Sequence, residues 1–399
     1  MKDLTINGSL KIRNLQAADY PAAKEIITQS FDDHLGANPG VLDAYEQEPW
    51  YDPEHLLVAE VDGQVVSQMG VRDGTLWIEG KSFPAGLVGT VCTLPEFRGK
   101  GIGAEMMKAA FSWMNRRGLA LSYLHTSEAR HGFYGRLGYR LSSYFQARTL
   151  LESGPQAGGV DDARIRKSTP SDAALLNTLY EAHYGALSGA WSRTEVFWRR
   201  RLEGKPKLWF TGTPEFWILE DKVPLAYLGI VPGSPTRIIE FACPTLDLSS
   251  AKRLFNCVVH RFGDAEIQVW VAERDPLSEA LSDHKLTQRS SFGNVFIRVQ
   301  EESAFLKLAG ELLSARAEKF GVGFEIRIKD TGSVLAGGNL GDRVVLSIPL
   351  NDLGALVYSG GRIQKQLEKG IIECISGKEK DLMNLFPETY PSRCPMDGY

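Results

Sequence analysis

The spacing of hydrophobic residues divides the first 150 residues into alternating helices and strands. Apolar residues recur at three- and four-residue intervals in two segments, which is the pattern of an amphipathic helix. Elsewhere, short apolar runs or alternating apolar and polar residues predict strands. Two Asp-Gly pairs, Asp62-Gly63 and Asp73-Gly74, predict turns between strands. The expected elements are strands at 10–15, within 55–80, at 85–94, at 119–126 and from Tyr139, and helices at 17–31, at 104–117 and around Phe133.

The middle third of the chain repeats this order of elements. Three pairs of segments match in the same order along the chain, each at an offset of about 150 to 160 residues. Such a shared order predicts a duplicated unit, and the glycine-rich acidic segment 152–162 is typical of a linker between the copies. The matching pairs are 11–19 with 164–172, 55–71 with 215–231, and 137–145 with 286–294.

The last hundred residues follow a different pattern, with a long helix before any strand. Asn351 is a plausible N-cap for a later short helix. We therefore predict an α/β (α+β) fold with three domains at 1–150, 151–300 and 301–399. The expected elements of the last domain are helices at 302–320, 351–361 and 362–370, and strands at 323–332 and 342–350.

Composition narrows the class of protein. Of the 399 residues, 43% are hydrophobic and 24% charged, which is typical of a soluble globular protein. The net charge of −4 gives no overall attraction for nucleic acid. The five cysteines form no C-x-x-C pair, which argues against a disulfide framework and a structural metal site and favours a reducing compartment. The start of the chain lacks a signal-peptide core, and no apolar run is long enough for a membrane span. We expect a cytoplasmic protein.

One glycine-rich stretch, "RGKGIG" at 98–103, stands between the strand at 85–94 and the helix after it. A P-loop is excluded because Lys100 is followed by Gly101 rather than by Ser or Thr. A dinucleotide-binding loop fits the letters, but several strands come first and no acidic residue follows at the required distance. The third interpretation is R-x-x-G-x-G at a helix N-terminus, and the fourth is a glycine-rich turn without a ligand.

The R-x-x-G-x-G interpretation has a physical basis. Glycines at 99, 101 and 103 let the backbone turn inward, so that the free N–H groups at the helix start point at one diphosphate. The helix dipole adds to the attraction, and Arg98 and Lys100 can pair with phosphate oxygens. In the repeated unit, alignment through Cys92 and Cys243 places "SSAKRL" (249–254) at this position, so the glycines are lost there.

With these residues the first 150 positions resemble the GNAT superfamily of N-acetyltransferases, in which that loop holds the diphosphate of coenzyme A. The segment "FYGRLGYR" at 133–140 is similar to a second GNAT motif. The whole chain resembles the Eis (enhanced intracellular survival) family. That resemblance implies an active GNAT domain, a degenerate GNAT domain and a sterol-carrier-like domain, assembled as a hexamer. It also implies acetyl-CoA-dependent acetylation of small-molecule amines, such as aminoglycosides, or of lysine side chains.

The resemblance also assigns roles to residues. Tyr134 is the expected general acid, because a phenol is neutral at pH 7 and can protonate a thiolate. The main-chain carboxylate of Tyr399 is the expected base, and Phe31 and Asp33 are expected to line the amine pocket. His131 is either an alternative base or an exposed loop histidine. The expected cofactor-binding residues are Val91, Cys92, Thr93, Arg98, Gly99, Lys100, Gly101, Ile102 and Gly103.

Two further questions remain open at the level of sequence. The span from Glu25 to Val71 holds ten acidic residues and no lysine or arginine. It is either a solvated acidic face or a rim that attracts cationic substrates. The alternative function is a protein that binds CoA or a lipid and has lost catalysis.

Overall fold

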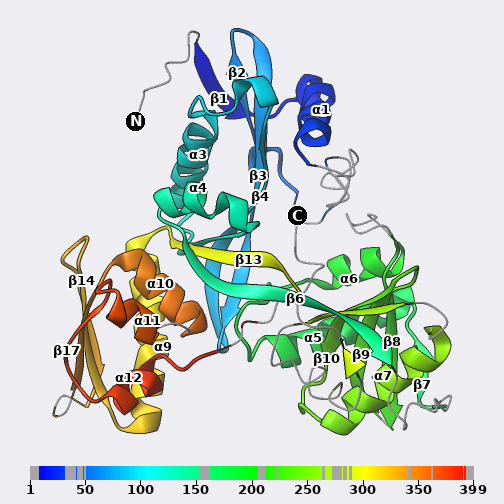
Figure 1. Cartoon of the computed structure of the whole chain (residues 1–399). Coiled ribbons are helices and arrows are strands. Elements are labelled where there is room, and N and C mark those ends of the chain that lie inside the picture. Colours follow the sequence, from blue (N-terminus) through cyan, green and yellow to red (C-terminus); the bar gives the residue numbers. More distant parts are fainter. Residues whose placement is uncertain are drawn as a thin grey trace.

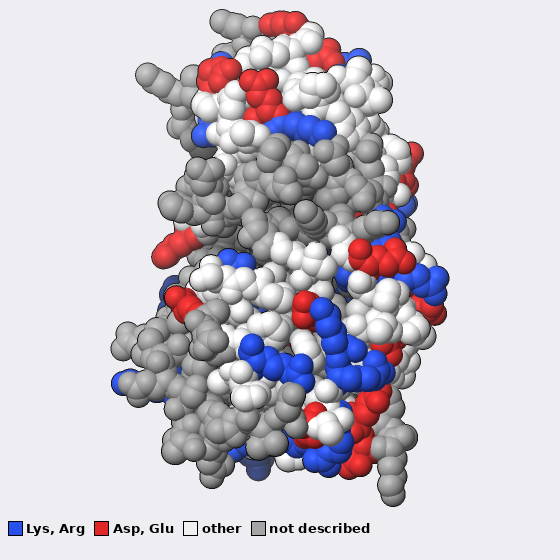
Figure 2. Space-filling model, turned by 90° about the vertical axis from the view of Figure 1, so that its right-hand side faces the viewer, with Lys and Arg blue, Asp and Glu red and all other residues white. Residues whose placement is uncertain are grey.

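The structure is a computed structural model in which residues 9–31, 42, 48, 51–152, 162–204, 212–221, 223–262, 266–271, 281, 285–286, 290–339, 341, 343–360, 363–389 and 391 are described. These residues form the mixed α/β fold that the sequence predicts (Figure 1). On the face shown in Figure 2, acidic and basic side chains are interspersed over the described surface, in keeping with the small net charge of −4. No described helix is long and apolar enough to cross a membrane.

The N-terminal unit is a twisted sheet with helices packed on it. Its helix α3 buries one face, formed by residues such as Met106, Ala110 and Trp113, at the spacing of an amphipathic helix. The elements are β1 (Leu10–Asn14), α1 (Tyr20–Ser30), β2 (Leu56–Val61), β3 (Gln64–Ile78), β4 (Lys81–Thr93), α3 (Ile102–Arg116), β5 (Leu121–Thr126), α4 (His131–Arg136) and β6 (Arg140–Glu152).

One predicted turn is wrong. Asp62-Gly63 does form the turn between β2 and β3, with φ of +49° and +86°. Asp73-Gly74, however, lies inside β3, and the turn to β4 is Glu79-Gly80. Gly74 is required for close packing instead, because a Cβ there would stand 3.1 Å from the ring of Trp191. An Asp-Gly pair therefore marks a close approach here rather than a change of direction.

The middle unit repeats the N-terminal one at its sheet edge. Arg13 forms a two-pronged ion pair with Asp19 and also contacts Glu60. In the middle unit Arg166 makes the same contacts with Asp172 and Glu220. The elements are β7 (Ile165–Lys167), α5 (Ala173–Tyr184), α6 (Glu195–Leu202), β8 (Glu215–Asp221), β9 (Val223–Val231), β10 (Thr236–Ala242), α7 (Leu248–Phe262), β11 (Ile267–Val271), β12 (Lys285–Leu286) and β13 (Ser290–Val299).

The two units exchange their last strands. The sheet runs β1-β2-β3-β4-β5-β13-β6-β11-β10-β9-β8-β7, so β13 joins the N-terminal half and β6 joins the middle half. In Figure 1 both long strands cross between the two lobes. Strand β13 pairs with β5 on one side and β6 on the other. A strand from the middle unit thus lies beside the strands that frame the candidate site.

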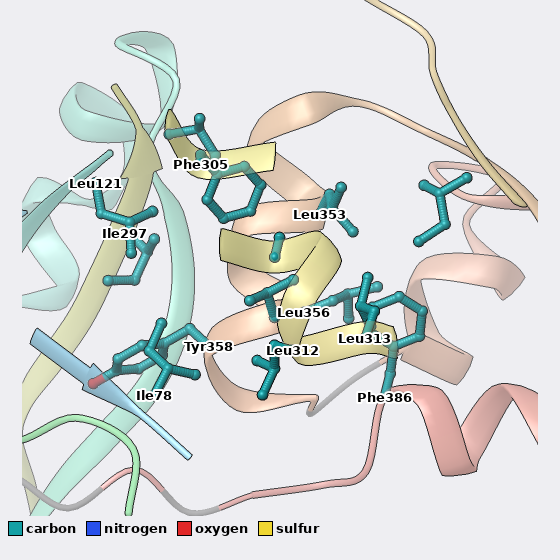
Figure 3. Packing of buried hydrophobic residues seen from close by; sticks show 14 of the residues in the cluster. Ile78, Leu121, Ile297, Phe305, Leu312, Leu313, Leu353, Leu356, Tyr358 and Phe386 are labelled. Atoms are coloured by element: carbon teal, nitrogen blue, oxygen red, sulfur yellow. The ribbon is translucent and has the colours of Figure 1, made fainter. Parts of the chain in front are cut away.

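The C-terminal unit packs its helices against the N-terminal sheet. Phe305 on α9 lies between Ile297 on β13 and Leu353 on α10 in one continuous core (Figure 3). Arg316 pairs with Glu79 across this boundary. The elements are α9 (Glu302–Phe320), β14 (Gly323–Ile328), β15 (Val334–Gly338), β16 (Arg343–Ile348), α10 (Leu350–Ser359), α11 (Ile363–Glu368), β17 (Glu373–Ser376) and α12 (Glu379–Leu385), with the strands in the order β15-β14-β16-β17.

Asn351 does not have the predicted capping role. The N-cap of α10 is Pro349, and Asn351 lies in the first turn of the helix. Its side-chain Oδ1 accepts a hydrogen bond from the backbone N–H of Val299 at 2.9 Å. The side chain therefore ties α10 to β13 and does not satisfy its own helix.

Candidate acyl-transfer site

A gap opens in the N-terminal sheet where β4 leaves β5. The two strands pair in parallel from Ala85 and Leu121 as far as Val88 and Leu124, and the ladder ends there. Both strands continue, β5 along β13 and β4 along β3. Among the described residues, no strand pairs with the β5-facing edge of β4 beyond Val88. Val91, Cys92 and Thr93, expected from the sequence to bind the cofactor, lie on this open edge.

A bulge in β4 causes this separation. Between its pairings with Gln68 and Gly70 of β3, β4 contains one extra residue. Thr90 in the bulge has φ of +48°, a left-handed conformation that is uncommon for residues other than glycine. Such a bend re-aims the strand end, and here it turns β4 away from β5.

The N-terminus of α3 faces the same region and has no side-chain cap. Gly99 and Gly101 have φ of +75° and +83°, and Gly101 is the N-cap residue. Both glycines are exposed, and nothing lies within 4 Å of the Cβ that either would carry. The first N–H groups of the helix thus remain for a ligand, and the helix dipole favours an anion there. These residues fit the diphosphate of a nucleotide-like group.

The basic side chains of this loop have neighbours of their own. Arg98 donates from Nε to the carbonyl of Thr93 at 2.9 Å and from Nη2 to Ser30 Oγ at 3.3 Å. It therefore ties the ends of α1 and β4 together. Lys100 lies over the ring of Phe97, with Nζ 4.7 Å from the ring centre. The pairing of Arg98 and Lys100 with phosphate oxygens stays a prediction.

Tyr134 lies next to this loop on the short helix α4. A Cβ at Gly103 would stand 3.4 Å from the ring of Phe133, so the first turn of α3 lies against α4. Tyr134 packs edge-on against Phe133 and is only 8% exposed. Burial raises the pKa of Tyr134 to about 12, against a smaller lowering by Arg130. Its phenol therefore stays protonated at neutral pH.

Cys92 lies in the same region, and burial also changes the pKa of its thiol. Its thiol is buried, accepts a hydrogen bond from Gln68 Nε2 at 3.1 Å, and contributes to the electrostatic field at Tyr134. Burial raises the pKa of Cys92 to about 12. The two pKa values are raised by the same cause, burial, so both the Cys92 thiol and the Tyr134 phenol stay protonated at neutral pH.

The structure describes some of the remaining residues that the sequence predicts for the site, and others lie outside the described ranges. Phe31 is the C-cap residue of α1 and packs, half-buried, against the N-terminal core. Asp33 and Tyr399 lie outside the described residues. His131 begins α4, and its Nε2 lies 2.7 Å from Asn294 Nδ2 on β13. The interpretation of His131 as an exposed loop histidine is therefore wrong, and its ring nitrogen is occupied by β13.

The acidic span is in part a structural feature. Of the six acids of this span that the structure describes, four form ion pairs with arginines outside the span. Glu48, for example, pairs with Arg201 of α6 in a buried contact of 2.5 Å. The other three are Asp52 and Glu54 with Arg117, and Glu60 with Arg13. These four acids therefore link elements of the fold, and an acidic rim formed by the rest of the span stays a prediction.

In the middle unit, the N-terminus of the equivalent helix is capped by a carboxylate of the chain itself. Helix α7 begins at Leu248, and the Asp247 carboxylate accepts hydrogen bonds from the N–H groups of Ser249 and Ser250 at 3.1 and 3.0 Å. Hydrogen bonds from the two serines lower the pKa of Asp247 to about 2. The predicted alignment is wrong in register, because 249–254 lies within α7 and not in the loop before it. The loss of the glycines holds, and Asp247 occupies the place of an anionic ligand.

Comparison with known proteins finds a family match in the N-terminal unit. Residues 11–142 match the family model described as an acetyltransferase (GNAT) domain. An uncharacterized N-acetyltransferase of Archaeoglobus fulgidus is 32% identical over 111 residues, which are 27% of this chain and 66% of the relative. A mycothiol acetyltransferase of Thermomonospora curvata is 26% identical over 146 residues, 35% of this chain and 47% of the relative. The chain thus spans 66% and 47% of the lengths of these curated relatives.

Solved structures share the fold over almost the whole chain. A GCN5-related N-acetyltransferase from Kribbella flavida superimposes with a TM-score of 0.71 at 18% identity, covering 97% of this chain and 98% of that one. Eis1 from Mycobacterium abscessus gives 0.64 at 15% identity, with 96% and 98% covered. Saccharomyces cerevisiae N-myristoyltransferase with bound myristoyl-CoA gives 0.55 at 11% identity, with 74% and 84% covered. Residues 11–142 therefore match a GNAT acetyltransferase domain, and the chain as a whole shares its fold with these solved structures.

Proposed function

We propose that the protein is an acetyl-CoA-dependent N-acetyltransferase that transfers the acetyl group directly to an amine. The observation that carries this proposal is the convergence of three features: the open edge of β4, the uncapped N-terminus of α3 and the protonated phenol of Tyr134. Acyl transfer from a thioester needs an anion site for the CoA diphosphate, a donor for the thioester oxygen and an acid for the thiolate.

Each feature has a role in that reaction. Backbone N–H groups from Gly101 to Gly103 would hold the diphosphate of CoA. The open edge at Val91–Thr93 would bind the pantetheine arm as an added strand and polarise the thioester carbonyl. When the amine attacks that carbonyl, a C–N bond forms and the C–S bond breaks. Tyr134 then gives its proton to the departing thiolate.

The base that takes the proton of the amine is proposed to be the C-terminal carboxylate of Tyr399. The described part of the tail supports this assignment. Thr389 donates its N–H to the carbonyl of Ser359 at 2.8 Å, beside Tyr358. Tyr358 packs on Tyr123 of β5, with ring centres 6.1 Å apart, so Thr389 lies beside the helix that contacts the strand bordering the gap. The ten residues after Thr389 span up to roughly 35 Å when extended.

The assignments for the rest of the chain rest on the Eis resemblance. The middle unit is proposed to be a degenerate GNAT domain that binds no CoA, which the Asp247 cap supports. Phe31 and Asp33 are proposed to line the amine pocket, with an aminoglycoside-like, polyamine or lysine amine as substrate. The domain limits at 150 and 300, the sterol-carrier-like nature of the C-terminal unit, the hexamer and the cytoplasmic location stay predictions.

The test is release of CoA thiol from acetyl-CoA with a panel of polyamines, aminoglycosides and lysine peptides. The proposal predicts turnover with at least one amine, and no turnover with any of them would refute it. The second candidate function is an acyl-CoA-binding protein without catalysis. The shared fold with an N-myristoyltransferase that was solved with myristoyl-CoA supports the acyl-CoA site that both candidates require. CoA binding without thiol release would support it.

A further inference from the structure

Gln68 of β3 is buried beneath the bulge that separates β4 from β5. Its side chain is fully buried, and its Nε2 donates to the carbonyl of Thr90 at 2.6 Å and contacts Cys92 Sγ at 3.1 Å. A carbonyl can only accept, so the group facing Thr90 must be the NH2 end of the amide. Gln68 thus holds the one residue of β4 that has a left-handed conformation.

The other end of the same amide lacks a partner. Gln68 Oε1 is buried and accepts no hydrogen bond from the described residues, and the same holds for Thr90 Oγ1. Unpartnered buried polar atoms are uncommon and costly, and they point to a missing ligand. Gln68 contacts Cys92, which lies in the field of Tyr134, so these atoms belong to the candidate site. The pantetheine arm of CoA carries amide N–H groups that can serve as donors.

We propose that Gln68 is a positioning residue of the acyl-CoA site: its Nε2 fixes the Thr90 bulge, and its Oε1 accepts a hydrogen bond from the bound acyl donor. The inference rests on the proposed function, because it assumes that the slot beside β4 receives CoA. A bulge held by a side chain of the neighbouring strand keeps the slot open before the ligand arrives. The affinity for CoA then depends on a residue that no sequence motif marks.

The experiment measures the dissociation constant of CoA by calorimetry with the full chain, which requires no amine substrate. Gln68→Met keeps the length of the side chain but removes both hydrogen-bonding groups, and we expect CoA to bind about 10-fold more weakly. The matched control is Gln300→Met. Gln300 is also buried, and its Nε2 donates to the carbonyl of Phe111 at 2.8 Å, but it lies near the far end of α3. This control should bind CoA within about 2-fold of wild type.

A second variant separates positioning from simple packing. Glycine adopts φ of +48° without strain, so Thr90→Gly in the Gln68→Met background should restore the bulge. We expect this double variant to recover about half of the lost free energy of binding, to within about 3-fold of wild type, because the bulge is restored while the Oε1 acceptor is still missing. If Gln68 only fills space in the core, the Thr90→Gly substitution should not restore CoA affinity in the Gln68→Met background.

The outcomes are distinct. If wild type binds CoA and Gln68→Met binds it equally well, the inference fails while the proposed function stands. The inference also fails if Gln68→Met weakens binding and the double variant binds no better. If wild type binds no CoA at all, the proposed function and the inference are both overturned.

Discussion

Gly101 and Gly118 offer a matched test of the anion site, because they stand at opposite ends of α3. Both have positive φ, +83° and +67°, and neither has an atom within 4 Å of the position that a Cβ would take. Alanine at either position meets the same backbone strain, about 1–2 kcal/mol for a left-handed conformation. Gly101→Ala and Gly118→Ala should therefore lower the free energy of unfolding by similar amounts, which denaturant titration measures.

The two variants should differ in CoA binding. At Gly101 the added methyl group lies at the helix N-terminus, where the N–H groups are proposed to bind the diphosphate. Loss of one charge-assisted hydrogen bond, about 1.5–3 kcal/mol, corresponds to about 10- to 100-fold weaker binding. Gly118 follows the C-terminal end of α3, so Gly118→Ala should bind CoA like wild type. Equal CoA affinity in both variants, measured by calorimetry, would refute the placement of the diphosphate.

Four further predictions follow from the same structure. Tyr134→Phe should lower kcat about 100-fold or more while changing the free energy of unfolding by less than about 1 kcal/mol, because the hydroxyl has no hydrogen-bond partner among the described residues. With the pKa of Tyr134 at about 12, the wild-type rate should show no loss from phenol ionisation up to about pH 10. Deleting Tyr399 should lower kcat more than about 100-fold and leave the CoA dissociation constant within about 2-fold; unchanged kcat would reject it as the base. Burial lowers the pKa of His183 from 6.5 to about 4, so the unfolded chain binds the extra proton between these values. The free energy of unfolding should therefore fall by roughly 3 kcal/mol as the pH drops from 6.5 to 4, and His183→Gln should remove this dependence.

The elements of the N-terminal unit could be read from the sequence because their signals are local. Helix α3 shows its buried face every three to four residues, and the glycines before it stand where positive φ is required. The prediction of a turn at Asp73-Gly74 was wrong because Gly74 is required for packing against Trp191, which is more than 100 residues away in the sequence. No local pattern records such a contact.

Only those residues of the candidate site that belong to a sequence motif could be predicted from the sequence. The loop at 98–103 and Tyr134 stand out in the sequence, whereas Gln68 and Asn294 act through partners on other strands. The exchange of β6 and β13 is likewise a property of strand pairing. The contacts of Arg98 with Ser30 and Thr93 could not be predicted either, because they form only when α1 packs beside β4.

The central claim is that each chain has one acyl-CoA site, built by the N-terminal unit, while Asp247 closes the equivalent place in the middle unit. Equilibrium dialysis with labelled CoA counts these sites directly. The account predicts one CoA per chain for wild type and for Asp247→Asn, with binding weakened by Gly101→Ala. Two CoA molecules per chain, or none, would contradict it.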